Sequence, residues 1–531
     1  MRPGNNPVEQ FKASKGGDPL RIREDLPRLI QNGWESLTPA DKDLLKWLGI
    51  FFRKPTPGQF MMRIRMPNGF ATSEQLRAIA DLSRRLGNNI LDITTRQQVE
   101  LRGYTLDSIP EIFERLRGVN LRSLQTGMDN LRNFNGCPVA GLTPHELFDA
   151  SPVVMGLDQH CVGPEGNPEF TNLPRKMNVT ATACLQNCTH NESQDIALVP
   201  ARCCDRKGFN VIVGGKMGSG GFTVASPLDV FIEPDQAVEV VAELIKIYRD
   251  HGPRGPRPKC RFAFLIEEWG LPRLRDELVA RLRRELDPAG EDQRENGRTD
   301  HLGVSPQRQP SLMAVGLCVP TGRVHPDHME EIARLADTYG DGQVRFTVSQ
   351  DVIIPNVPEG QVAVLLKEPL LQTFSPAPSP FFRKMVACTG TDFCNLAVIE
   401  TKSRAVELSK ALEQRLGTEF DPTSIHWSGC PAGCGNHQAA DIGLRGMKVN
   451  IGGTPTDAVA IYVGGRTGRE PRPGTLIMEM VPCDEVLPDV VVTILKHLEL
   501  FKQVEREPAA KDRILMVPDT LSPETEGVAV P

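Results

Sequence analysis

The apolar residues between positions 60 and 100 change their spacing in a way that predicts a strand, a helix and a second strand. Every second residue is apolar at first, which is the period of a half-buried β-strand: Phe60, Met62, Ile64 and Met66. The spacing then becomes helical, with apolar residues on one face: Leu76, Ile79, Ala80 and Leu86. Ser73 can cap the start of this helix and Gly87 can end it. A strand ending in Asp92-Ile-Thr-Thr-Arg-Gln97 follows.

The same pattern returns later in the chain. Residues 65–101 align without a gap to residues 318–354, so that Pro67-Asn-Gly69 faces Pro320-Thr-Gly322. A second repeat aligns Cys184-Leu-Gln-Asn-Cys188 with the segment from Cys430 to Cys434. One block of two modules is therefore used twice, which predicts two fused α+β halves related by a pseudo-twofold axis.

These repeats divide the chain of 531 residues into segments, because so long a chain is not expected to have one core. We expect one pair of repeated modules at 53–135 and 311–375, and a second pair at 136–285 and 376–505. Residues 286–310 form a polar linker, 1–52 an N-terminal extension and 506–531 a C-terminal tail.

Composition excludes several classes of protein. Lys and Arg together number 61 against 67 Asp and Glu, so the net charge of −6 gives no sign of nucleic-acid binding. No apolar run is long enough to span a membrane, and the first residues carry no export signal. Thirteen cysteines, an odd number, in such a chain favour reduced thiols and a cytoplasmic location over a disulfide scaffold.

Four cysteines carry the clearest chemical signal. Cys388 and Cys394 lie in Cys-Thr-Gly-Thr-Asp-Phe-Cys, and Cys430 and Cys434 lie in Cys-Pro-Ala-Gly-Cys. Four thiolates from two loops punctuated by Gly and Pro can enclose a cubane iron–sulfur cluster. Structural zinc favours cysteine pairs spaced two to four residues apart, so the five residues between Cys388 and Cys394 argue against a four-cysteine zinc protein.

The two cysteine motifs resemble those of the sirohaem-containing nitrite and sulfite reductases, and the likeness extends from about Phe60 to about Gly468. This resemblance implies a [4Fe-4S] cluster held by the four cysteines, with Cys434 also bridging to the iron of a sirohaem. It also implies that the modules at 53–135 and 311–375 are ferredoxin-like halves. The modules at 136–285 and 376–505 are then halves of sirohaem and iron–sulfur type, of which only the second is expected to hold a cluster. Ala432 departs from the family, which usually has Asn there.

The resemblance also implies a site for a small oxyanion. Arg96 and Lys176 match the family's substrate-site motifs and are expected over the distal face of the sirohaem, opposite Cys434. Asn178 stands where similar sulfite reductases have a second Lys, which favours nitrite as the substrate. Glu165 occupies a position where the family commonly has Arg, and an acid there weakens anion capture unless it points away or pairs with a base.

Neither a dinucleotide fingerprint nor a flavin module is found, since the segment from Gly214 to Gly221 has the wrong glycine spacing. Electrons are therefore expected from reduced ferredoxin or a similar small acidic donor. The resulting hypothesis is a ferredoxin-dependent nitrite reductase. A sulfite reductase on the same scaffold, an enzyme like precorrin-3B synthase and, more remotely, a structural zinc protein stay as alternatives.

Cys184 and Cys188 permit two interpretations. They could begin a second cluster, with Cys161, Cys203 or Cys204 approaching in space, or they could be remnants in the half without a cofactor. We favour the second interpretation, because the stretch before Cys184 contains no counterpart of the Cys388 motif. Cys137, Cys260, Cys318 and Cys483 are expected to be ordinary buried residues.

Overall fold

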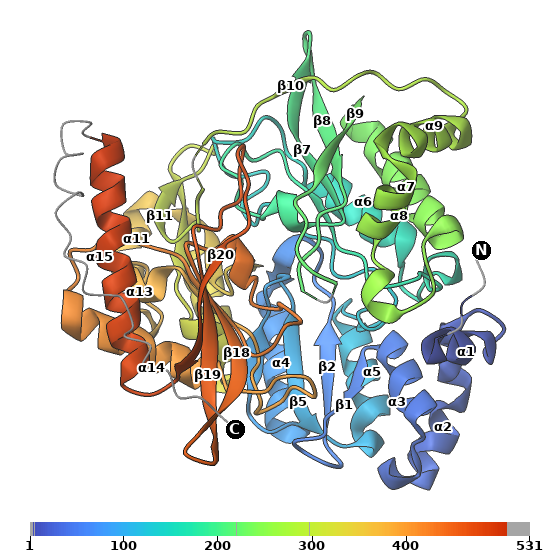
Figure 1. Ribbon diagram of the computed structural model, residues 1–531, viewed down its shortest axis with the longest axis horizontal. Helices are drawn as coiled ribbons and strands as arrows, with labels where there is room; N and C mark the ends of the chain where they lie inside the picture. The colour runs from blue at the N-terminus through green and yellow to red at the C-terminus, as the bar shows by residue number, and fades with distance from the viewer. Residues whose placement is uncertain (1–3, 5, 219, 297, 507–531) are drawn as a thin grey trace, which may run out of the picture.

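The structure is a computed structural model that describes residues 4, 6–218, 220–296 and 298–506. Its strands form four sheets, and helices cover the outer faces (Figure 1). Two sheets belong to the ferredoxin-like halves and the other two to the halves that follow them in the chain. The predicted mixture of helices and sheets in a duplicated block is therefore present.

The two ferredoxin-like halves have matching sheets, with strand orders β1-β2-β5-β4-β13 and β11-β12-β15-β14-β3. The elements of the first half are β1 (Ile50–Phe52), β2 (Phe60–Ile64), β3 (Phe70–Thr72), α4 (Ser73–Arg85), β4 (Leu91–Ile93), β5 (Val99–Tyr104) and α5 (Ile109–Gly118). Those of the second are β11 (Gly303–Pro306), β12 (Leu312–Leu317), β13 (Arg323–Val324), α10 (Pro326–Tyr339), β14 (Gln343–Phe346), β15 (Val352–Pro358), α11 (Glu359–Leu365) and α12 (Leu370–Thr373).

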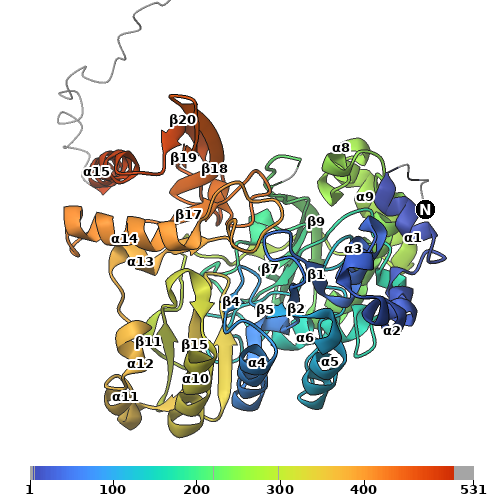
Figure 2. The ribbon, with the colours of Figure 1, turned by 90° about the horizontal axis from the view of Figure 1, so that it is seen from below.

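Each ferredoxin-like half completes its sheet with a strand from the other. β13 pairs antiparallel with β4, and β3 pairs antiparallel with β14. Helices α4 and α10 pack against each other, and Figure 2 shows them along one side of the two sheets. One continuous apolar core, which includes Ile79 and Ile332, consequently spans both halves.

Two local predictions are wrong in this region. Helix α4 is capped by Thr72, whose side chain accepts a hydrogen bond from the Gln75 amide, and Ser73 is its first residue. Strand β2 is buried on both faces, because Met61 and Arg65 are covered as well. The guanidinium of Arg65 donates to the carbonyls of Leu131 and Arg132, so the segment after α5 covers this face.

The other two sheets follow the same plan as each other. In the first half, β6 pairs parallel with β7, and the antiparallel strands β8 and β9 follow. Its elements are α6 (Ser151–Cys161), β6 (Val179–Ala181), β7 (Ile196–Cys203), β8 (Arg206–Val213), β9 (Ser226–Ile232), α7 (Ala237–His251), α8 (Phe262–Trp269), α9 (Leu271–Leu282) and β10 (Glu291–Asp292).

In the second half the strand order is β16-β17-β18-β19-β20, and the pairs β16–β17 and β17–β18 are parallel. Its elements are α13 (Pro380–Arg383), β16 (Met385–Ala387), α14 (Lys402–Leu416), β17 (Ile425–Ser428), β18 (Ile442–Ile451), β19 (Thr454–Val463), β20 (Thr475–Pro482) and α15 (Val486–Arg506). Parallel strands end at the same edge of a sheet, and this edge carries the cysteine loops.

The N-terminal extension packs against the first core. Its helices are α1 (Pro7–Ala13), α2 (Ile22–Asn32) and α3 (Pro39–Leu44), and it buries Leu20, Ile22 and Trp47 there. The Trp47 indole also donates to the Thr171 carbonyl at 2.9 Å, which ties the extension to the neighbouring half. Nearly all of the expected C-terminal tail, residues 507–531, lies outside the described residues. Over the part of the chain that is described, no helix has both the length and the apolar character needed to cross a bilayer.

Candidate active site

Cys388 and Cys430 are placed side by side by two parallel strands. Cys388 follows the last residue of β16, and Cys430 comes two residues after the end of β17. Ala387 and Trp427 are partners in this ladder, and the Cys388 amide donates to the Trp427 carbonyl at 3.0 Å. The amide of Gly429 then donates to the Cys388 sulfur at 3.1 Å. A backbone amide aimed at a sulfur is the kind of contact that stabilises a metal-bound thiolate.

Cys394 and Cys434 complete this group from the adjoining loops. Cys434 is exposed and Cys394 is half-buried, and both lie close enough to Cys430 for their charges to act on its thiol. Burial raises the pKa of Cys388 to about 12 and that of Cys430 to about 11. Such thiols keep their protons in the absence of a metal, and a metal ion that binds them must displace those protons.

A glycine loop from the first half packs onto the loop of Cys430 and Cys434. Gly218 has φ of +90°, and a Cβ atom there would lie 1.9 Å from the carbonyl oxygen of Ala432. Gly218 therefore serves a close approach of two backbones. Ala432, a departure from the family, takes part in this contact through its backbone.

Arg96 lies in the tight turn between β4 and β5 and not at the end of a strand as predicted, since β4 ends at Ile93. The Gln97 amide closes the turn on the Thr94 carbonyl at 3.0 Å. The neighbouring Thr95 hydroxyl donates to the carbonyl of Cys434 at 3.2 Å. The turn of the first ferredoxin-like half is thus fixed directly against the cysteine loop of the last module.

Asn178 is held on both sides of its amide. Its side-chain oxygen accepts from Arg96 Nε at 2.9 Å, and its side-chain nitrogen donates to Asp195 at 3.1 Å. Asp195 is fully buried and forms an ion pair with Arg261 at 2.8 Å. Asn178 therefore fixes the direction of the Arg96 guanidinium and neutralises no charge itself.

Lys176 is a half-buried cation, and over the described residues its ammonium makes no hydrogen bond or ion pair. Burial, together with the nearby Arg261 and Arg96, holds the pKa of Lys176 well below its ordinary value. A thiolate at Cys434 acts in the opposite direction on the pKa of both Lys176 and Arg96, so these cations lie near this cysteine. An ammonium with a lowered pKa is well suited to give up a proton.

Other charged residues beside these motifs differ in whether they form an ion pair. Arg102 forms an ion pair with Asp92 at 2.6 Å, and Arg383 forms one with Asp300 at 2.8 Å. Arg132, by contrast, is buried with a single hydrogen bond to the Asn130 carbonyl. Glu165 is exposed and faces Arg23 at 4.0 Å, so it pairs with a base as anion capture requires.

The second half carries different residues at the positions aligned with Arg96 and Asn178. Ser349 occupies the place of Arg96 in the aligned hairpin, and Ser424 occupies that of Asn178. Asp441 accepts a hydrogen bond from the Ser424 amide at 2.9 Å, as Asp195 does from the Asn178 amide at 2.8 Å. The backbone arrangement is therefore repeated, whereas the two copies carry different side chains at these positions.

Cys184 and Cys188 have partners that the sequence did not reveal. Their sulfur atoms lie with those of Cys137 and with a ring nitrogen of His301, and all four atoms are within 4.8 Å of one another. Cys161, Cys203 and Cys204 do not join this group. The prediction of Cys137 as an ordinary buried thiol was incomplete, because it is buried but not isolated.

Comparison with known proteins places the chain in a family. Residues 127–286 and 379–517 match the family model for the nitrite and sulphite reductase 4Fe-4S domain. Residues 52–119 and 305–371 match the model for the nitrite/sulfite reductase ferredoxin-like half domain. The chain belongs to the nitrite and sulphite reductase family. The resemblance inferred from the cysteine motifs is thereby confirmed.

Members of this family resemble the chain over nearly its whole length. It is 44% identical to the ferredoxin–nitrite reductase of Synechococcus elongatus, covering 92% of this chain and 96% of that protein. It is 40% identical to the chloroplastic ferredoxin–nitrite reductase of Spinacia oleracea, covering 96% and 87%. The solved structure of the Mycobacterium tuberculosis NirA protein superposes with a TM-score of 0.87 at 28% identity, covering 93% and 94%.

The fold predicted for this nitrite and sulphite reductase family member is confirmed by these matches. Each of the two family models occurs twice and in alternation along the chain, as the internal repeats indicate. Members of this family carry a [4Fe-4S] cluster and a sirohaem as cofactors. The individual module boundaries and the roles of single residues stay predictions.

Proposed function

We propose that this enzyme reduces nitrite to ammonia by six electrons in an assimilatory role, with reduced ferredoxin as the electron donor. The curated relatives over nearly the full chain are ferredoxin–nitrite reductases. The observation that carries the proposal is the pair of cations, Arg96 and Lys176, near Cys434, with Asn178 between Arg96 and Asp195. Two cations suit an anion that carries one negative charge. The side chain of Asn178 is uncharged, so it adds no third cation to the site.

The described residues fit both cofactors. Cys388, Cys394, Cys430 and Cys434 would supply the thiolates for the cluster, and the exposed Cys434 would also serve the sirohaem. Buried basic atoms that lack protein partners suit the carboxylates of a sirohaem: Arg53 Nε and one terminal nitrogen of Arg102, with Lys176 and Arg132 nearby. When bound, the cluster and the sirohaem supply electron transfer and a metal site for the substrate nitrogen.

The protein's own residues bind, orient and protonate. Arg96 presents its guanidinium to the anion, held in direction by the Asn178 oxygen at 2.9 Å. Lys176 can donate a proton to an oxygen that leaves as water, since the pKa of its ammonium is lowered by burial. Asp195 receives no proton in this scheme, because it is paired with Arg261 and holds Asn178.

The finer features of the partner and the location are also proposals. We infer that any small acidic protein with a low reduction potential can replace ferredoxin if it docks near the cluster loops. A cytoplasmic location is expected from the thirteen cysteines, none of which forms a disulfide.

The decisive experiment compares substrates in the purified enzyme. Its visible spectrum should show sirohaem, and kcat/KM measured with reduced viologen dye should favour nitrite over sulfite. Cys434→Ser should reduce the bound sirohaem and the activity together, because a serine oxygen is a poor substitute for a thiolate at iron. Preference for sulfite would assign the chain to the sulfite reductases, and sirohaem without either reaction would favour an enzyme like precorrin-3B synthase.

A further inference from the structure

Four potential metal ligands meet in the half that is expected to lack a cofactor. The sulfur atoms of Cys137, Cys184 and Cys188 and one ring nitrogen of His301 all lie within 4.8 Å of one another. Cys137 Sγ and His301 Nε2 are 3.5 Å apart. Among the residues that the structure describes, no other group of such ligands gathers this closely.

The three cysteines occupy the same places as cluster ligands of the other half. Asn135 pairs in parallel with Thr180, and Val386 pairs in parallel with His426, so Cys137 and Cys388 each lie two residues beyond equivalent rungs of the ladder. Cys184 and Cys188 align with Cys430 and Cys434. Cys394 alone has no counterpart in the first half.

The fourth ligand comes instead from the segment that joins the two halves. His301 lies within residues 286–310, just before β11. Its backbone amide donates to Thr299 Oγ1 at 3.1 Å, and its φ is +59°. Its carbonyl lies against Gly316, where a Cβ atom would come within 1.9 Å of that oxygen. The ring of His301 is thus directed at the cysteines by a fixed backbone.

We propose that Cys137, Cys184, Cys188 and His301 bind a single Zn²⁺ ion in a structural site. Tetrahedral zinc has Zn–S bonds of about 2.3 Å and Zn–N bonds of about 2.0–2.1 Å, which puts neighbouring ligand atoms about 3.4–3.8 Å apart. The Cys137–His301 distance of 3.5 Å agrees with this geometry. A cubane cluster binds each thiolate through a different iron and needs them farther apart than this group allows.

The ligand types and their burial support the same ion. Three thiolates and one imidazole form a set typical of structural zinc, and the three residues between Cys184 and Cys188 fall within the usual spacing. Cys137 and Cys184 are each 1% exposed, and the cysteines share an apolar cluster with Ala314 and Ile353 of the second ferredoxin-like half. Four protein ligands leave no open position, so the site is closed to substrate.

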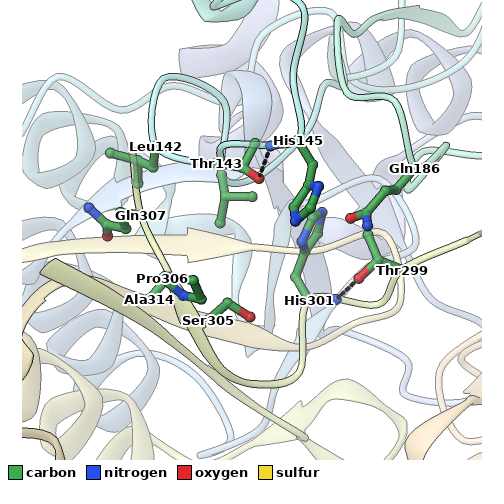
Figure 3. A pocket seen from close by; sticks show the side chains of 11 residues that line it. Leu142, Thr143, His145, Gln186, Thr299, His301, Ser305, Pro306, Gln307 and Ala314 are labelled. Carbon is green, nitrogen blue, oxygen red and sulfur yellow. Dashed lines mark hydrogen bonds between the residues drawn. The ribbon is translucent and has the colours of Figure 1, made fainter. Parts of the chain in front are cut away.

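A cavity adjoins this group at His301. It has a volume of about 190 Å³ and is lined by His301, His145, Gln186 and Thr299 among others (Figure 3). His145 and His301 lie at the same end of it (Figure 3). An ion bound at the end of this cavity would join the linker, the first half and the second ferredoxin-like half at one point.

The test is the metal content of the purified holoenzyme. Zinc should be present at one ion per chain, in addition to the iron of the cofactors. His301→Gln and Cys188→Ser should each lower zinc at least tenfold while the iron and sirohaem contents stay unchanged. Cys260→Ser is the matched control, because this buried thiol donates only to the carbonyls of Gly255 and Pro256 and should leave zinc unaltered.

X-ray absorption at the zinc edge tests the proposal without any variant. The wild-type holoenzyme should give three sulfur neighbours at about 2.3 Å and one nitrogen at about 2.0–2.1 Å. Absence of zinc from protein expressed with added zinc would overturn the proposal. So would a disulfide among the three cysteines in mass spectra of alkylated protein, or a loss of iron in place of zinc from Cys188→Ser.

Discussion

The amide of Asn178 separates an arginine from a carboxylate at the anion site, and its replacement tests how charge selects the substrate. Asn178→Lys should raise the ratio of kcat/KM for sulfite to that for nitrite by about tenfold, equivalent to about 1.4 kcal/mol. The added ammonium favours the more highly charged anion, although Asp195 will neutralise part of it. The two specificity constants should be compared at equal sirohaem content.

Asn178→Ala is the control for this change, because it removes the acceptor of Arg96 without adding charge. It should lower turnover of both anions and leave their ratio unaltered. An unchanged ratio in Asn178→Lys would remove position 178 as a determinant of the substrate.

Lys176 offers a second test at the scale of single residues. Lys176→Met should lower kcat for nitrite by about 10²–10⁴-fold, since it removes a proton donor and a cation with almost no change in volume. Lys246→Met is the control and should leave kcat unaltered, because this lysine of helix α7 pairs with Glu243 and Glu169. Equal rates in Lys176→Met and wild type would show that protons reach the substrate by another path.

Single residues could be predicted from the sequence where a motif is local. The cysteine loops, Arg96 and Asn178 each lie within a few residues of a recognisable pattern. Cys137 and His301 could not, since Cys137 is 47 residues before Cys184 and reaches it through strand pairing, and His301 comes from a segment without any repeat. Only the strand pairing shows that Asn135 and Val386 take equivalent places, which puts Cys137 in register with Cys388.

At the scale of elements, the contact between two loops predicts a difference between neighbouring glycines. Gly218→Ala should disturb the loop of Cys430 and Cys434 and lower the iron content severalfold, because its Cβ atom collides with the Ala432 carbonyl at 1.9 Å. Gly221→Ala is matched in backbone strain, with φ of +94°, but its Cβ atom meets nothing within 4 Å.

Iron and sirohaem per chain should therefore decrease in Gly218→Ala and stay close to wild type in Gly221→Ala. Equal losses in both variants would assign the effect to backbone strain, and the contact with the cysteine loop would then be unnecessary for cofactor binding.

Elements were predictable where the periodicity was strong. Strand β2 and helix α4 follow directly from the spacing of apolar residues. The N-cap of α4 is Thr72, one residue before the predicted Ser73. Thr and Ser are both good N-caps, and only the hydrogen bonds with Gln75 decide between them. The sequence of β2 does not predict that both of its faces are buried, because the residues that cover the second face belong to the segment after α5.

At the scale of the molecule, Asp92 joins three modules through its carboxylate. It contacts Arg102 of its own half, Arg323 of β13 and Lys402 of α14. Burial by itself raises the pKa of Asp92, but these three cations outweigh burial and hold the pKa well below its ordinary value. The resulting stabilisation is present above the unfolded pKa of about 3.9 and is lost as pH falls below it.

Asp92→Asn should therefore destabilise the enzyme near pH 7 by about 3–5 kcal/mol, because three buried cations lose their shared partner. Thermal inactivation at a fixed heating rate provides the measurement. The difference from wild type should shrink as pH falls below about 4, and Asp81→Asn, at an exposed pair with Arg85, should show little effect at any pH. A difference independent of pH would exclude the carboxylate's charge as the cause.

The duplication and the family could be predicted for the whole molecule, and the exchange of strands could not. Alignment of residues 65–101 with 318–354 reveals two copies, yet each copy contains a complete set of strand patterns. Only the register of β13 on β4 and of β3 on β14 shows that the copies complete each other. Two-residue and three-residue strands carry too little pattern to indicate their partners.

The exchanged strands have a consequence for synthesis on the ribosome. Arg323, which binds Asp92 across the pair of β13 and β4, follows it by 231 residues. Synthesis proceeds at about 5–20 residues per second, so the edge of β4 stays without its partner strand for roughly 10–50 s. During that interval the nascent chain presents an unpaired strand edge, the kind of surface through which chains aggregate. The duplicated architecture thus creates a period in which the protein depends on its surroundings to stay monomeric.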